Sequence, residues 1–175
     1  ILVLTAFVRA VAAGDLDPTE RTTVTARYRI GGVGTAGFTD DVEASWRDLA
    51  LNMMTMSDNA ATDVIYHRLG ADAVNRVVSD LGLQKTRLIG CCEDLFATVV
   101  ADLGGDADSD LDELLESATA EQILALDAVH PLKTSHSTPR EVATLLNALW
   151  TDTAAPADAC RQARDTMALQ IWPHR

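Results

Sequence analysis

Three consecutive polar residues, Ser57, Asp58 and Asn59, end an apolar run that carries three methionines. A second helical pattern begins directly after them, with Val64 and Ile65 on its apolar face. Ser, Asp and Asn side chains bond to nearby backbone groups, so they are typical of helix starts and turns. The sequence therefore predicts a sharp polar corner between two helices. Such a corner either only caps a helix or also points short polar side chains into a cleft.

The composition limits the class of protein. The chain has 175 residues, of which 47% are hydrophobic and 23% are charged, so it can bury a core and disorder is not the default. We expect a single domain over residues 1–175. The net charge of −12 argues against nucleic acid and anionic membrane surfaces as partners, because their phosphates attract basic proteins.

The cysteines and histidines do not form a recognisable metal or disulfide pattern. Cys91, Cys92 and Cys160 are too few and too poorly spaced for a disulfide scaffold or a zinc site. Ordinary surface or core positions are expected for the four histidines, which lack metal-ligand spacing: His67, His130, His136 and His174. We predict no metal and no organic cofactor.

The first residues are apolar and helical in period. Residues 1–8 are too short to span a bilayer, no basic region precedes them, and Arg9 interrupts the apolar run. The pattern continues to Ala13, and Gly14 supplies a left-handed helix end. We interpret this segment as the continuation of a helix that starts upstream. No signal sequence is visible, so the sequence leaves the localisation open.

Helical periodicity dominates the remaining chain. A β-branched segment at 22–30 predicts at most a short strand, and an irregular glycine-rich excursion follows at 31–37. Gly104 to Asp108 predicts a turn or loose loop. The sequence therefore predicts a mainly α chain of seven or eight helices. They are expected at 1–13, 45–56, 59–69, 72–81, 92–103, 111–126 with a break near Thr119, 138–151 and 160–171.

Two of these helices begin with specific capping signals. Ser45 is a plausible N-cap with Asp48 three residues further on, as in a capping box. The later helix has Thr138 as N-cap, Pro139 at the first helical position and Glu141 at the box position.

The order of these segments resembles the penicilloyl serine transferases, and within them the class A β-lactamases. The signature of that branch is S-x-x-K, S-D-N and K-T-G. Residues 57–59 match the S-D-N motif, and 60–63 resemble its usual continuation. Four more segments match in the same order. They are Ala12–Asp17 with A-G-x-L-D, Trp46–Leu49 with L-R-D-L, Leu81–Leu88 with L-G-x-x-x-T-R-L, and Ser137–Pro139 with T-T-P.

The resemblance implies a fold of which this chain is one part. The chain would be the helical subdomain of the family's α+β fold. The lysine of S-x-x-K would fall immediately before Ile1, and the K-T-G strand would follow Arg175. Both motifs are absent from this sequence. The chain is therefore expected to lack the terminal strands and the attacking serine.

The resemblance also implies an acyl-enzyme mechanism without a cofactor. Ser57 would pass a proton to the lactam nitrogen as the ring opens. Asn59 would bond the carbonyl of the substrate's side-chain amide and the lysine of S-x-x-K, and Asp58 would point inward to hold the corner. The expected partner is a β-lactam or a peptidoglycan-like amide, and we expect a monomer without membrane insertion. Relatives are usually exported.

One departure from the family pattern leaves alternatives open. Class A enzymes deacylate with an omega-loop glutamate that activates water, but 126–134 carry no E-x-x-L-N pattern. Glu121 belongs to the acidic helix. Asp127 and His130 are possible bases without the right neighbours. The protein could therefore be a D,D-peptidase, a penicillin-binding protein or a slow esterase. A non-catalytic helical module, in which S-D-N is only a cap, is the third alternative.

Overall fold

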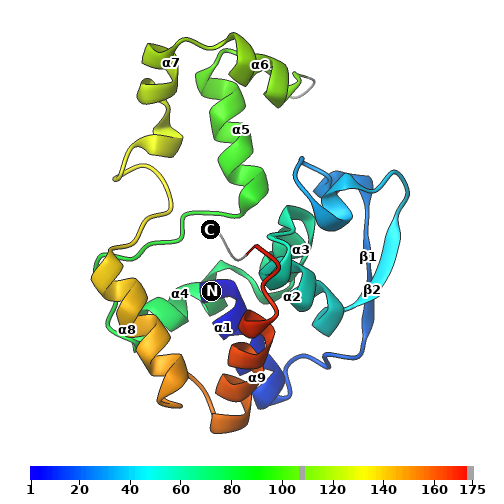
Figure 1. The fold of residues 1–175 in the computed structure, drawn as a ribbon, viewed down its shortest axis with the longest axis vertical. Coiled ribbons are helices and arrows are strands. Elements are labelled where there is room, and N and C mark those ends of the chain that lie inside the picture. Colours follow the sequence, from blue (N-terminus) through cyan, green and yellow to red (C-terminus); the bar gives the residue numbers. More distant parts are fainter. Residues whose placement is uncertain (107–108, 173–175) are drawn as a thin grey trace.

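A computed structural model describes residues 1–106 and 109–172 (Figure 1). His174 and part of the turn expected at 104–108 lie outside the described residues. Within the described ranges the chain is mainly helical, which confirms the predicted fold class. None of the helices in these ranges has the length and apolar character needed to cross a membrane.

The described elements agree with the expected helices in order and type, but the last helix begins and ends three residues earlier than the expected 160–171, and the described residues form nine helices because 111–126 divides into two. Strands β1 (Arg21–Val24) and β2 (Val42–Ser45) pair antiparallel, with Arg21 opposite Ser45. Three short 3-10 turns are η1 (Ala26–Tyr28), η2 (Gly34–Gly37) and η3 (Asp127–Val129). The helices are α1 (Leu2–Ala13), α2 (Trp46–Thr55), α3 (Asn59–Leu69), α4 (Ala71–Asp80), α5 (Cys92–Asp102), α6 (Leu111–Ser117), α7 (Ala120–Ala125), α8 (Pro139–Trp150) and α9 (Ala157–Ala168).

Helix α1 forms the centre of the main helical body and packs against α2, α3, α4 and α9. Its side chains Leu4, Phe7 and Val8 recur every three or four residues on one face and are fully buried. Leu49 of α2 and Ile65 of α3 meet them in the same core. Burying each such side chain contributes about 1.5–3 kcal/mol. The core therefore fixes α2 and α3, the two helices that flank the polar corner.

Helices α5, α6 and α7 project from this body, as Figure 1 shows in green and yellow-green. The two segments that connect them to the body are joined by a pair of backbone hydrogen bonds, each 2.9 Å long, between Arg87 and His136. The break expected near Thr119 is confirmed, because a capping box of Thr119 and Gln122 starts α7. Neither α6 nor α7 contains a buried residue, so this region contributes little to the core.

The expected caps form, with one difference. Ser45 accepts a hydrogen bond from the Asp48 N–H at 3.3 Å, and Thr138 accepts one from the Glu141 N–H at 3.2 Å. However, the Glu141 carboxylate does not close the capping box. It accepts instead from the Lys85 N–H at 2.8 and 3.0 Å and from the Thr86 hydroxyl at 2.5 Å. These long-range bonds outcompete the local one and tie α8 to the segment before α5.

The pH dependence of the unfolding free energy tests whether the hydrogen bonds from Lys85 and Thr86 to Glu141 stabilise the fold. The hydrogen bond from Thr86, helped by that from Lys85, lowers the pKa of Glu141 below its ordinary value of 4.5. Ionised Glu141 therefore stabilises the fold above that value, and the contribution is lost as the pH falls through the lower folded-state pKa. Glu141→Gln should lower the denaturation midpoint at neutral pH, and the difference from the unmodified protein should shrink in acid.

Glu116→Gln is the matched control, because Glu116 is exposed on α6. It removes the same charge without breaking these bonds. A Glu141→Gln difference that stays constant across the acid range, or that Glu116→Gln reproduces, would contradict the proposed tie.

Candidate functional site

The corner between α2 and α3 contains only Met56, Ser57 and Asp58. Ser57 is exposed and has a φ of +63°, in the left-handed region that residues with a Cβ seldom adopt. Such a conformation costs on the order of 1–3 kcal/mol and persists only where the surroundings impose it. The corner therefore holds a hydroxyl group at the surface in a conformation that the isolated chain would avoid.

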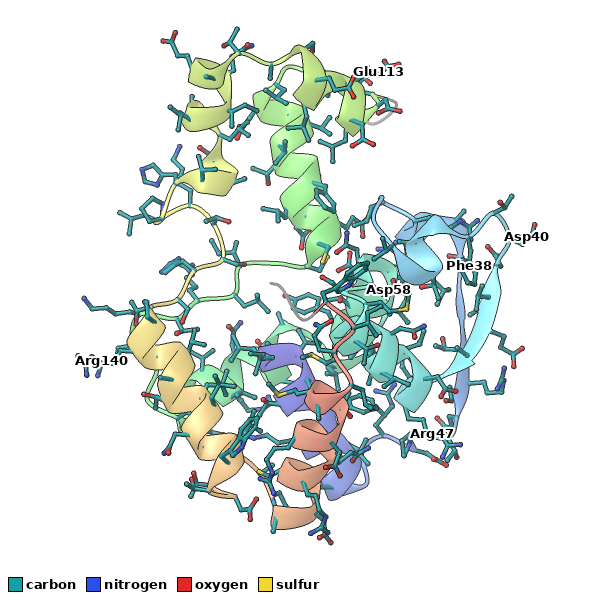
Figure 2. All side chains as sticks on the ribbon, in the orientation of Figure 1. Phe38, Asp40, Arg47, Asp58, Glu113 and Arg140 are labelled. Atoms are coloured by element: carbon teal, nitrogen blue, oxygen red, sulfur yellow. The ribbon has the colours of Figure 1, made fainter. Side chains whose placement is uncertain are left out.

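Asp58 is the anchor of the corner. It is fully buried, and its Oδ1 caps α3 by accepting from the Ala61 N–H at 3.0 Å. Its Oδ2 accepts from the Thr35 N–H at 2.6 Å and from the Thr35 hydroxyl at 2.8 Å. Figure 2 shows Asp58 in the interior, near the point where α5 approaches α3. Hydrogen bonds to a charged group each contribute about 1.5–3 kcal/mol. The buried carboxylate therefore joins the corner to η2.

Two glycines allow this close approach. A Cβ at Gly34 would lie 2.4 Å from Asp58 Oδ2, and a Cβ at Gly32 would lie 2.8 Å from Asn59 Nδ2. Both glycines also have positive φ angles. The glycine-rich excursion is therefore the backbone surface against which the corner is packed, and side chains at these positions would displace Asp58 and Asn59.

Asn59 is half-buried at the start of α3. Its Nδ2 donates to the carbonyl of Gly31 at 3.0 Å, which fixes the plane of the amide. This bond uses one of the two N–H groups that a carboxamide carries.

The end of α2 is held by the segment that follows α9. Ile171 N–H donates to the carbonyl of Thr55 at 3.1 Å, and the Trp172 indole N–H donates to the carbonyl of Met56 at 3.0 Å. The Gln170 amide donates to the carbonyl of Met54 at 2.9 Å. These bonds satisfy carbonyls that a helix end leaves without an intrahelical partner. The corner is thus held by hydrogen bonds on the α2 side as well as on the α3 side.

Asp63, one turn beyond Asn59, connects the corner helix to α5. It is fully buried, and its two oxygens accept from the N–H groups of Cys92 and Glu93, each at 2.8 Å. A carboxylate at a helix N-terminus is also favoured by the helix dipole. Burial, and then the charge of Asp63, raise the pKa of the Cys92 thiol to about 12. Cys92 is therefore a protonated thiol at neutral pH.

The three residues considered from the sequence as possible bases do not lie at the contact between α3 and the start of α5. Asp127 pairs with Lys133 at 2.7 Å, and its N–H donates to Asp102 at the last residue of α5. That residue is about 15 Å from the start of α5, given a rise of about 1.5 Å per residue. His130 is exposed beside Asp127. Glu121 is exposed on α7.

Sequence reasoning identified the corner but missed two of its partners. Thr35 lies in the segment for which the sequence predicts only an irregular excursion, and the sequence marks Asp63 only as part of the continuation of the S-D-N motif. One signal for Thr35 was the glycine cluster around it, because glycines mark close backbone approaches. For Asp63 the signal was its place beside Val64 and Ile65, which both prove to be buried.

Comparisons with known proteins agree with this architecture. The family model of the beta-lactamase enzyme family matches residues 1–175. A β-lactamase from Sphaerobacter thermophilus is 24% identical with a TM-score of 0.73, over 99% of this chain and 54% of its own. PBP-A is 22% identical with a TM-score of 0.69, over 97% of this chain and 51% of its own.

The chromosome-encoded β-lactamase of Vibrio parahaemolyticus is 16% identical with a TM-score of 0.69, over 97% of this chain and 53% of its own. No curated protein matches the chain. The chain therefore spans about half the length of these solved structures, and it shares the fold of their helical part.

The packing of Gly34 against Asp58 can be tested against a matched glycine. Gly14 and Gly34 have the same φ of +79°, but a Cβ at Gly14 would meet open space. Gly14→Ala should therefore cost only the backbone strain, about 1–2 kcal/mol of unfolding free energy. Gly34→Ala should cost at least about 2 kcal/mol more, because it also disturbs the bonds of a buried carboxylate. Equal losses in urea unfolding would show that Asp58 is not the anchor.

Proposed function

We propose, from the premise that this chain belongs to the beta-lactamase enzyme family, that it forms one wall of the acyl-transfer site of a serine hydrolase. The substrates would be β-lactams or related amides and esters. The attacking serine would belong to an S-x-x-K motif, which this chain does not contain. The observation that carries the proposal is the exposed Ser57, whose backbone is held in a strained left-handed conformation next to the buried anchor Asp58.

Ser57 would act as a proton relay. When the lactam ring opens, its C–N bond breaks and the nitrogen must receive a proton. A hydroxyl group donates and accepts at once, so Ser57 can give its proton to that nitrogen while it takes one from a neighbouring donor. Its exposure and its fixed backbone suit this task, because a relay must be both reachable and positioned.

Asn59 would bind the substrate, and Asp58 would position both neighbours. One N–H of Asn59 is held by Gly31, so the amide presents its other polar groups in a fixed direction. A carbonyl on the substrate's side chain would accept from it. Asp58 is buried and engaged by three protein groups, and it would therefore touch neither substrate nor reacting atoms.

The second candidate function is that of a serine hydrolase whose acyl-enzyme is hydrolysed slowly, and one observation favours it. Asp63 is engaged by the N–H groups of both Cys92 and Glu93. The Glu93 carboxylate lies 3.7 Å from Arg27, so both carboxylates at this junction already have protein partners. Asp127 is paired with Lys133 and docked at the far end of α5. If no other base reaches the ester, the acyl-enzyme would persist, as expected for a penicillin-binding protein, a D,D-peptidase or a slow esterase.

Mass spectrometry of the full-length protein with a penicillin tests the proposal and separates the candidates. An adduct that forms and disappears rapidly indicates a β-lactamase. An adduct that lasts indicates a penicillin-binding protein or peptidase. If the full-length protein neither forms an adduct nor turns over substrate, the result contradicts the proposal and supports a non-catalytic helical module. An adduct on Ser57 itself would contradict the relay role.

Ser57→Ala should slow acylation by about 10²–10⁴-fold, the usual contribution of a positioned proton donor. Asn59→Ala should mainly weaken binding, by about 1–3 kcal/mol for the lost hydrogen bond. Stopped-flow acylation by a chromogenic β-lactam separates the two effects. Wild-type acylation rates in Ser57→Ala would exclude the relay.

Ser57→Gly tests whether the strain at the corner serves function. Glycine adopts positive φ without a Cβ penalty, so this variant should unfold at equal or higher denaturant concentration than the unmodified protein, gaining up to about 1 kcal/mol. It should lose acylation as fully as Ser57→Ala, which keeps the Cβ and the strain. A Ser57→Gly variant that is less stable than Ser57→Ala would show that the left-handed conformation is not costly here.

A further inference from the structure

A thiol, an imidazole and a carboxylate converge where α5 meets α3. His67 lies on α3, Cys91 directly precedes α5, and Glu93 lies in the first turn of α5. Cys91 Sγ is 3.8 Å from His67 Nε2, and that nitrogen is 3.6 Å from Glu93 Oε2. One ligand atom from each of the three residues lies within 4.8 Å of the others. Linear spacing could not reveal this cluster, because its members come from two elements.

These separations fit metal ligands better than they fit hydrogen bonds. Good N–H···O bonds measure about 2.7–3.2 Å, so the contact between His67 and Glu93 is too long to be one. A tetrahedral zinc ion with bonds of about 2.3 Å to sulfur and about 2.0–2.2 Å to nitrogen and oxygen separates its ligand atoms by roughly 3.3–3.6 Å. The measured distances for these two pairs lie within a few tenths of an ångström of that range.

The donor set selects the kind of cation. A thiolate, an imidazole and one carboxylate suit zinc, whereas magnesium and calcium prefer oxygen ligands alone. The burial pattern leaves one side open, because Cys91 is buried while Glu93 is half-buried and His67 is exposed. An open side provides room for a water as fourth ligand, the arrangement of three-ligand zinc sites.

The surroundings hold the donors in place. Asp94 Oδ2 accepts from the Cys91 N–H at 2.9 Å, and Asp63 accepts from the Glu93 N–H at 2.8 Å. These bonds fix the backbone at the two residues from which the thiol and the carboxylate project. The Arg27 guanidinium lies 3.7 Å from Glu93 Oε2, the same oxygen that lies 3.6 Å from His67 Nε2. A carboxylate oxygen carries two lone pairs, so it can serve the ion and Arg27 together.

We propose that His67, Cys91 and Glu93 bind a zinc ion that fastens the start of α5 to α3. The ion would cross-link the projecting helices to the corner helix at a point that Asp63 already holds by hydrogen bonds. This site does not depend on the proposed hydrolase activity, so either can fail without the other.

Metal titration of the full-length protein tests the site. The metal-free protein is titrated with Zn²⁺ against a chromophoric chelator, and with Co²⁺ to record its spectrum. The expected result is one tight Zn²⁺ per chain, with a cobalt spectrum that has a thiolate charge-transfer band and intense tetrahedral bands. Cys91→Ser should abolish the charge-transfer band and weaken Zn²⁺ binding at least tenfold.

Cys92→Ser is the matched control, because Cys92 is the adjacent thiol and lies outside the cluster. It should keep both the cobalt band and the Zn²⁺ affinity. If Cys91→Ser fails to fold by circular dichroism, His67→Gln at an exposed position replaces it, with His130→Gln as its control. Absence of tight binding, unchanged binding in the cluster variant, or equal losses in cluster and control variants would each overturn the proposal.

Discussion

The structure around the polar corner depends on one buried carboxylate. Asp58 is fully buried, and it is compensated by the Thr35 N–H, the Thr35 hydroxyl and the Ala61 N–H. A charge in the interior is tolerated only with such partners, so the glycine-rich segment and the start of α3 must stay where they are. This requirement explains the glycine at 34, where a Cβ would meet Asp58, while the glycine at 32 leaves room for Asn59. It also explains how Ser57 can be kept in a left-handed conformation while its hydroxyl faces the surface.

Much of the helical architecture was predictable, because its signals are local. Apolar periodicity located the helices, and capping chemistry at Gly14, Ser45 and Thr138 located several of their ends. These signals act over three or four residues, so one sequence is enough to read them. The corner itself was predictable for the same reason, since Asp58 is an N-cap as well as an anchor.

The interactions between distant segments were not predictable. Strand β2 forms only because β1 lies beside it, and Glu141 leaves its local capping box for Lys85 and Thr86. The docking of α5 on Asp63, and with it the cluster of donors at the start of α5, joins residues about thirty positions apart. Periodicity carries no information about such pairs.

A crystal structure of the full-length protein acylated by a penicillin tests the central claim most directly. The account predicts that the covalent bond joins the drug to a serine outside this chain. Ser57 Oγ should then lie within about 3 Å of the former lactam nitrogen, and the Asn59 amide within about 3 Å of the carbonyl of the drug's side chain. An acyl group attached to Ser57, or one bound on a surface remote from the corner, would contradict the account.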